Sequence, residues 1–97
     1  LGTNHPDYAH LLNNLAALYV VMGKDDEVEK LLRKALDIYK GKLGENSPAY
    51  AATLSNLGNF LRVKARNNEA LDALSKTEQI RKQTLGENHP EYVKALY

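Results

Sequence analysis

The side chains that could do chemistry are few and lie far apart in the chain. The three histidines are the candidate metal ligands. His5 and His10 are five residues apart, a spacing that does not bring two side chains onto one helical face, and His89 lies far along the sequence. A zinc site needs three or four converging ligands, and the chain has no cysteine to supply them. The sequence therefore predicts no metal site, and it offers no motif for another cofactor.

The sequence also lacks the motifs that would indicate phosphate binding or covalent catalysis. The loops that read LGEN, at residues 43–46 and 85–88, lack the GxGxxG or GxxxxGK spacing of phosphate-binding loops. Glu45 and Glu87 recur at one place in these loops, and we interpret them as solvated loop residues. The serine, histidine and aspartate residues occur without a nucleophile motif. We therefore predict that the chain is not an enzyme, and that its function lies in a surface built by its structural elements.

Those elements are organised by a segment of the form LGxNxPxY. It begins at Leu1, Leu43 and Leu85, so the period is 42 residues. Aligning the first 42 residues with the next 42 without gaps gives 15 identical positions. A fixed period of this length is the signature of a repeat architecture. We expect one domain made of a first repeat (1–42), a second repeat (43–84) and the start of a third (85–97).

The amino-acid composition limits the kinds of partner that the chain can bind. The chain has 13 basic and 12 acidic residues, and its net charge of +1 predicts neither a nucleic-acid nor a membrane partner. No apolar run approaches the ~20 residues that span a bilayer, and the first ten residues do not form a signal peptide. The absence of cysteine fits any compartment, although it favours an intracellular, cytoplasmic one. Because the chain does not begin with Met, we expect it to be a piece of a longer array.

Apolar residues spaced i, i+3, i+4, i+7 predict two helices in each repeat and no strand. Proline suits the first helical position, and His5 and Ser47 precede two of the prolines as N-caps. The expected helices cover residues 6–22, 26–40, 48–64 and 68–84, with a fifth starting at Pro90. The apolar stripes include Leu11, Leu18, Met22 and Leu71.

Turn residues are predicted from the same pattern. Gly23 is expected to stop the first helix with a positive φ, and Asp25 or Asp26 to cap the second. Gly41 and Gly44 are expected to end the second helix. Asn67 and Asn68 take the place of the glycine turn in the second repeat, because asparagine tolerates the left-handed conformation.

The residues of each repeat resemble those of a known family. The first repeat carries the large, large, small, aromatic, Gly, small, large, small pattern of the tetratricopeptide repeat (TPR) at Leu12, Leu15, Ala16, Tyr19, Gly23, Val28, Leu32 and Ala35. The 42-residue unit, with LGxxHPxYAxxLNNLAxLYxxxGK, is similar to the kinesin-light-chain-like subtype. This resemblance implies an all-α, right-handed superhelix, a TPR solenoid. Departures such as Ala65 at the turn and Thr77 in the last helix predict looser packing of the second repeat, and they argue against a kinesin light chain itself.

The resemblance also implies where a ligand binds. In such proteins the first helix of each repeat lines a concave wall that holds an extended peptide. The positions carried over are His10, Asn13, Asn14, Ala17, Val21, Ser55, Asn56, Asn59, Arg62 and Lys94, with Val20 and Val63 beside them. Asparagine can donate to and accept from a peptide backbone, while Arg62 and Lys94 would favour acidic groups. Tyr8, Tyr50 and Tyr92 recur at the period of 42 and are predicted to pack in the core or between repeats.

The function predicted is a non-catalytic scaffold that binds a protein or peptide on this wall. The alternative is a structural spacer or self-associating element, whose exposed apolar end faces form a homo-oligomer. A third possibility, a nucleic-acid-binding helical repeat, would need a basic groove, which the net charge of +1 argues against.

Overall fold

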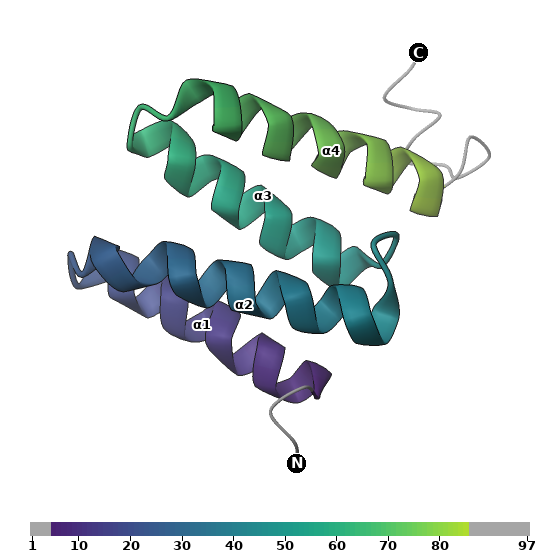
Figure 1. Cartoon of the computed structure of the whole chain (residues 1–97), viewed down its shortest axis with the longest axis horizontal. Helices are drawn as coiled ribbons and strands as arrows, with labels where there is room; N and C mark the ends of the chain where they lie inside the picture. Colours follow the sequence, from purple (N-terminus) through teal and green to yellow (C-terminus); the bar gives the residue numbers. More distant parts are fainter. Residues whose placement is uncertain (1–4, 86–97) are drawn as a thin grey trace.

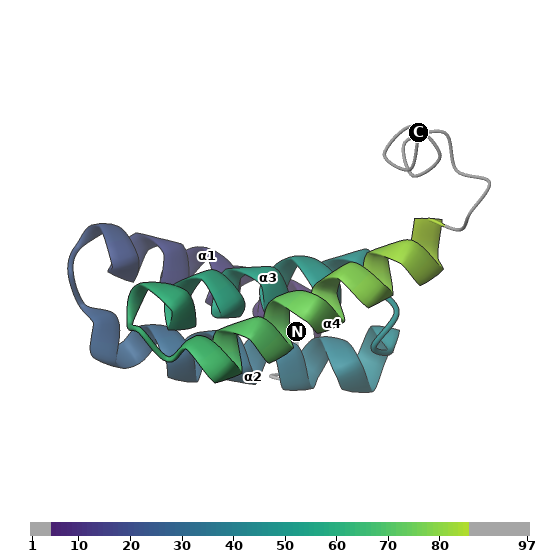
Figure 2. The same cartoon turned by 90° about the horizontal axis from the view of Figure 1, so that it is seen from above.

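The computed structural model describes residues 5–85, which form four helices and contain no strand. They are α1 (Pro6–Val21), α2 (Asp25–Leu43), α3 (Pro48–Val63) and α4 (Asn67–Leu85). α1 pairs with α2, and α3 with α4, as two helical hairpins stacked through α2 and α3 (Figure 1). Seen from above, α1 and α3 lie in one layer and α2 in the other (Figure 2). The all-α repeat fold predicted from the sequence is confirmed, whereas the fifth helix, from Pro90, falls outside the described residues.

The first helix of each hairpin begins as the sequence predicts. The His5 imidazole accepts a hydrogen bond from the Asp7 N–H through Nδ1 at 3.0 Å, and the Ser47 hydroxyl accepts one from the Tyr50 N–H at 3.1 Å. Both bonds satisfy N–H groups that a helix leaves free in its first turn. His5, which was considered as a metal ligand, therefore has a structural role at the start of α1.

The turns between paired helices differ from the prediction. Gly23 has the expected positive φ of 76°, but in the second repeat the left-handed residue is Ala65, with φ 63°, and Asn67 is already helical. The two turns are built alike: the Lys24 N–H donates to the Tyr19 carbonyl, and the Arg66 N–H to the Leu61 carbonyl, both at 2.9 Å. The shared hairpin geometry therefore places Ala65 in a conformation that L-residues disfavour by roughly 1–2 kcal/mol.

The start and end of α2 also correct the prediction. Lys24 is the N-cap and makes no side-chain capping bond, so neither Asp25 nor Asp26 caps the helix; both lie in its first turn, where acidic groups suit the helix dipole. α2 continues through Gly41 to Leu43. Gly44, with φ 85°, ends it by donating its N–H to the carbonyls of Tyr39 and Lys40, each at 3.1 Å. A glycine inside a helix weakens it without ending it.

Small residues let the paired helices approach closely. A Cβ added to Gly58 of α3 would lie 2.8 Å from Cγ and Cδ2 of Leu74 in α4, closer than carbon atoms pack. Thr77 is buried beside this contact, and its hydroxyl donates to the Ala73 carbonyl at 2.8 Å. The buried hydrophobic core is continuous through both hairpins and consists of Ala9, Leu12, Ala16, Val28, Leu32, Ala35, Leu36, Ile38, Tyr39, Tyr50, Ala51, Leu54, Leu57, Leu61, Ala70, Ala73 and Ile80.

The predicted apolar stripes are only partly buried. Tyr50 lies in the core, and Tyr8 packs against the core. The Lys76 ammonium lies 5.9 Å from the centroid of the Tyr50 ring, and the Lys34 ammonium lies 5.4 Å from that of Tyr8. Tyr92 falls outside the described residues. Leu11, Leu18, Met22 and Leu71, which were placed on the packed stripes, are instead more than half exposed. None of the helices within residues 5–85 has the length and apolar character needed to cross a membrane.

Candidate functional site

The candidate site is a hollow between α1 and α3, on the side of these two helices where α2 forms its floor. Its volume is about 330 Å³. Apolar groups dominate its surface, and polar side chains stand around them. The lining residues are Asn13, Ala16, Ala17 and Val20 from α1, Asp25, Val28 and Leu32 from α2, and Asn56, Asn59, Phe60, Val63 and Lys64 from α3 and its end. Pockets of ~300–1,000 Å³ with an apolar lining and a few placed polar groups are typical ligand sites.

Asparagine side chains bridge the two repeats at this hollow. The Asn56 amide Nδ2 donates to the Asn13 Oδ1 at 3.1 Å, although the residues are 43 positions apart. This bond uses one donor and one acceptor, and each amide has further hydrogen-bonding capacity. Within residues 5–85 the Asn59 side chain makes no hydrogen bond and is exposed at the same hollow. The pair links α1 and α3 across the hollow, while Asn59 is open to a ligand.

A charged pair and an aromatic ring close one end of the hollow. The Lys64 ammonium donates to the Asp25 carboxylate, joining the end of α3 to the start of α2. The same ammonium lies 5.9 Å from the centroid of the Phe60 ring. Because the two charges neutralise each other, this end of the hollow presents an aromatic surface bounded by a paired acid and base.

The structure brings together part of the predicted binding set. Asn13, Ala17, Asn56 and Asn59 line the hollow, and Val20 and Val63 do so beside them. Other predicted residues do not line it: His10, Asn14, Val21 and Arg62, which are exposed, and Ser55, which is half-buried. Lys94 falls outside the described residues. The wider set stays a prediction, and the structure assigns geometry only to its central members.

The predicted wall lacked six residues that line the hollow: three core residues on its floor, Ala16, Val28 and Leu32, and three at its end, Asp25, Phe60 and Lys64. Asp25 was predicted as a helix cap and Lys64 as the last residue of its helix, and Phe60 was not among the positions carried over for binding. The spacing of Asn56, Phe60 and Lys64, each four residues from the last, places them on one face of α3 and was the available signal. The partner of Lys64 could not be found in this way, because Asp25 lies 39 residues away.

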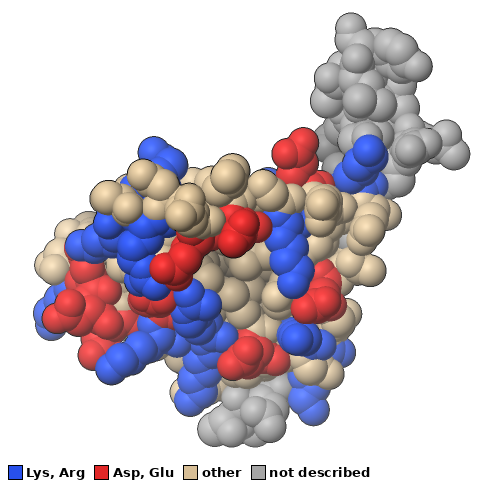
Figure 3. Space-filling view, turned by 45° about the horizontal axis from the view of Figure 1, so that its top comes forward, with Lys and Arg blue, Asp and Glu red and all other residues tan. Residues whose placement is uncertain are grey.

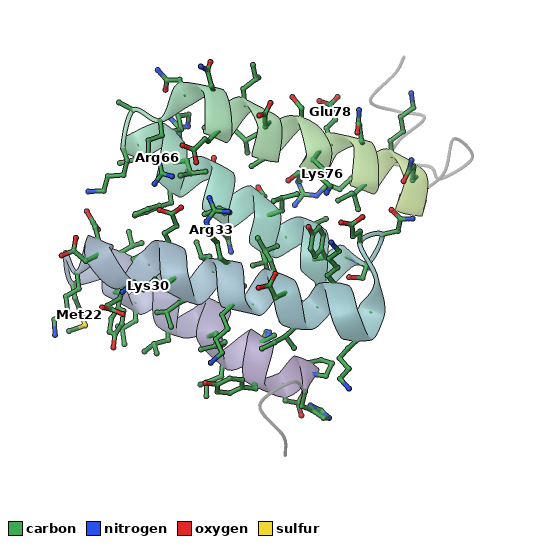
Figure 4. The ribbon with its side chains drawn as sticks, in the orientation of Figure 1. Met22, Lys30, Arg33, Arg66, Lys76 and Glu78 are labelled. Carbon is green, nitrogen blue, oxygen red and sulfur yellow. The ribbon has the colours of Figure 1, made fainter. Side chains whose placement is uncertain are left out.

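A second polar cluster joins the hairpins on the α2 and α4 side. Arg66 binds the Glu29 carboxylate through Nη1 and Nη2 at 2.5 and 3.2 Å, and it also binds Glu69 at 2.7 Å. Arg33 bonds Glu29 at 2.8 Å, and it lies close to Arg66 between the two hairpins in Figure 4. The hydrogen bond from Arg66, followed by that from Arg33, holds the pKa of Glu29 below its ordinary value against the opposing effect of burial. This cluster links the second repeat to the first through ion pairs.

Charges on the rest of this side are mixed. Lys76 and Lys40 both lie by the Glu45 carboxylate, and the hydrogen bond from Lys76 is the main cause of the lowered pKa of Glu45. Acidic and basic side chains alternate over the face shown in Figure 3, with no field of one sign. Within residues 5–85, no three His, Asp or Glu side chains are grouped as metal ligands.

A comparison with known protein families identifies the family of this chain. The model of a family described as tetratricopeptide repeat matches the chain twice, at residues 9–49 and 51–91. The chain belongs to the tetratricopeptide repeat family. The two matches begin 42 residues apart, as the repeated LGxNxPxY segment does, and the model is that of the kinesin-light-chain-like subtype of TPR. No curated protein matches the chain.

Membership gives the general class of function. TPR arrays mediate protein–protein interactions, and the family is typically a non-catalytic scaffold. In these terms α1 and α3 are the first helices of successive TPR units. The hollow between them, bridged by Asn13 and Asn56, lies where two TPR units meet.

Proposed function

We propose that this TPR segment binds an extended peptide across α1 and α3, with one apolar side chain of the peptide seated in the hollow between them. The observation that carries the proposal is the composition of the hollow: an apolar floor with amide groups at its edge. Such a site suits a peptide, which has an apolar side chain to bury and a polar backbone to pair.

The individual residues support distinct roles in that complex. Val20, Val63 and the Phe60 ring supply apolar surface for the seated side chain, since all three line the hollow. Asn59, with its free amide, pairs with the peptide backbone, because an amide offers one acceptor and two donors. Asn13 and Asn56 link the two helices through their mutual bond. The preference for acidic groups stays a prediction from Arg62 and Lys94, since Arg62 does not line the hollow.

The experiment begins with a random-peptide display selection on the immobilised chain. Affinities of the selected peptides are then measured by fluorescence anisotropy. Asn59→Ala is expected to weaken binding about 5- to 10-fold, the equivalent of one hydrogen bond of ~1 kcal/mol. Ala17→Trp, which fills the hollow from α1, is expected to abolish binding.

Asn68→Ala is the matched control, because Asn68 is an exposed asparagine on α4 that does not line the hollow. It should bind the peptides like the parent chain. If the selected peptides bind the Ala17→Trp variant unchanged while its circular dichroism matches the parent, the hollow is not the binding site. Asn14→Ala then reports whether the wider predicted wall takes part.

A further inference from the structure

A groove with charged walls runs between α2 and α4, over α3. Its volume is about 490 Å³. The hollow opens between α1 and α3 with α2 beneath it, whereas this groove opens between α2 and α4 with α3 beneath it, so the two face opposite sides of the molecule. The floor of the groove consists of Tyr50, Leu54, Leu57 and Leu61. The walls carry six charged side chains: Arg33, Asp37 and Lys40 on α2, and Glu69, Asp72 and Lys76 on α4.

This groove belongs to the junction of the two repeats and is not a face on which a further repeat packs. Repeats of a stacked array contact each other at equivalent positions. The α2 wall uses residues 33, 36, 37 and 40, whose equivalents on α4, 42 positions later, are residues 75, 78, 79 and 82. The α4 wall instead uses residues 69, 72, 73 and 76, which lie about a third of a helical turn away around the helix. Contact with a following repeat would therefore fall on another face of α4 and leave this groove open.

The charges at the end of the groove nearest the hairpin turns are paired. Arg33 donates to the Glu29 carboxylate at 2.8 Å, and its Nη2 lies 3.7 Å from the Glu69 carboxylate on the opposite wall. Arg33 and Lys76 lie between α2 and α4 in Figure 4 and mark the course of the groove. At this end a base on one wall thus faces an acid on the other, and the two charges neutralise each other.

At the other end of the groove, a side chain from a loop joins the two walls. Glu45, which precedes α3, has one carboxylate oxygen 3.5 Å from the Lys40 ammonium of α2 and 3.3 Å from the Lys76 ammonium of α4. Two like charges on opposite walls are therefore bridged by one opposite charge that reaches in between them. This bridge shows that the groove accommodates a charged side chain between its walls.

Between these two ends lie two acids, Asp37 and Asp72, one on each wall. Asp37 is three residues before Lys40, and Asp72 is four residues before Lys76, so both acids lie about one helical turn from the lysines. Within residues 5–85 neither carboxylate forms an ion pair or a hydrogen bond. Lys76 is within reach of Asp72 along α4, but it is bound to Glu45. In the described part of the chain, this level of the groove therefore lacks the opposite charge that bridges the two lysines.

The repeat fold does not require these two acids. The residue equivalent to Asp37 in the second repeat is Gln79, and the residue equivalent to Asp72 in the first repeat is Lys30. Both acids are exposed, so neither is held in place by packing. Carboxylates that face each other repel until an opposite charge lies between them. The two acids are therefore a feature of this junction that a cationic ligand would stabilise.

We propose that this groove docks a segment of a partner protein in which an arginine lies next to an apolar residue, with the guanidinium between Asp37 and Asp72. Arginine fits because its planar guanidinium carries N–H donors on more than one edge and can bond carboxylates on two sides. Its methylene stem lies along the leucines of the floor. This surface goes beyond the peptide site in the hollow, and binding at one of them does not depend on binding at the other.

Titration of the isotope-labelled full chain with a short peptide, followed by the chemical shifts of the backbone amides, tests the docking. The probe is the blocked peptide acetyl-Gly-Leu-Arg-Leu-Gly-amide. We expect saturable shift changes around Asp37 and Asp72, and none around Asn13 and Asn59 of the hollow. The same peptide with citrulline in place of arginine keeps the shape but loses the charge, and it should bind roughly 5- to 10-fold more weakly, as the loss of two exposed ion pairs predicts. Ala17→Trp, which fills the hollow, should leave both affinities unchanged.

Asp37→Asn with Asp72→Asn should remove the preference for arginine over citrulline, because the groove then holds no carboxylate for the guanidinium. Both residues are exposed, so this variant should keep the circular dichroism of the parent chain. The matched control, Glu27→Gln with Glu78→Gln, removes the same charge from the same two helices outside the groove. Both glutamates are exposed, and Glu78 points away from α3 in Figure 4. The control should keep the full preference for arginine.

Three results would overturn the proposal. The first is a peptide that causes no saturable shift change around the groove at millimolar concentration. The second is equal affinity of the parent chain for the arginine and citrulline peptides. The third is a control variant that loses the preference as fully as the Asp37→Asn, Asp72→Asn variant does, since the attraction is then made by the total charge and not by the groove.

Discussion

Substituting alanine for glycine at Gly58 should destabilise this protein, although the same substitution inside a helix ordinarily stabilises it. An alanine in a helix interior is favoured over glycine by roughly 0.5–1 kcal/mol. At Gly58, however, the new Cβ would lie 2.8 Å from Cγ and Cδ2 of Leu74 and 3.3 Å from Cβ of Ala73. Cγ is the branch point of Leu74, so the clash is not relieved by moving the tip of the side chain alone. Overpacking of this kind costs ~1–3 kcal/mol.

The net effect of Gly58→Ala is then a loss of about 1 kcal/mol. For a domain of this size that corresponds to a fall in Tm of roughly 4–8 °C. Thermal unfolding followed by circular dichroism at 222 nm measures it directly. Leu74→Ala removes the clashing atoms, so Gly58→Ala should change from destabilising to stabilising when it is made in the Leu74→Ala background.

Gly41→Ala is the matched control, because Gly41 also lies within a helix but its added Cβ would meet nothing within 4 Å. It should raise the stability by up to ~1 kcal/mol. If Gly58→Ala stabilises the chain as much as Gly41→Ala does, Leu74 does not pack on Gly58. The close approach of α3 and α4 described above would then be wrong.

Two further predictions concern the second turn and the junction between repeats. Ala65→Gly should raise the free energy of unfolding by roughly 0.5–1 kcal/mol, because Ala65 has φ 63° and glycine adopts that conformation without strain. Urea unfolding measures this change, and an unchanged urea midpoint would contradict it. The pKa of Glu29 is lowered in the folded chain. Its ion pairs therefore contribute fully to the stability at a pH above the ordinary pKa of 4.5, and this stability is lost as the pH falls through the lowered pKa of the folded chain. Glu29→Gln should therefore melt lower than the parent at pH 7 and lose less stability on acidification below pH 4.5. Parallel melting-temperature profiles for the two proteins would rule out this role of Glu29.

Local features of the sequence determined much of this structure. The 42-residue period, the helical spacing of apolar residues and the proline with its preceding cap all act within a few residues of one another. Within residues 5–85 they predict the four helices, their approximate bounds and the TPR family. Helix starts were predicted well at Pro6 and Pro48, because capping is a local interaction.

Tertiary structure decided which faces of those helices meet and which are left open. The Asn13–Asn56 bond, the Lys64–Asp25 pair and the Arg66–Glu29 pair join residues 37 to 43 positions apart, and their pairing depends on how one hairpin sits on the next. The same packing holds Ala65 in a left-handed turn against its own preference. Within residues 5–85 it also leaves Leu11 and Leu18 of α1 more than half exposed, whereas Tyr50 and Leu57 of α3 are buried. A helix periodicity shows that a face is apolar; only the placement of a neighbouring helix decides whether that face is core or binding surface.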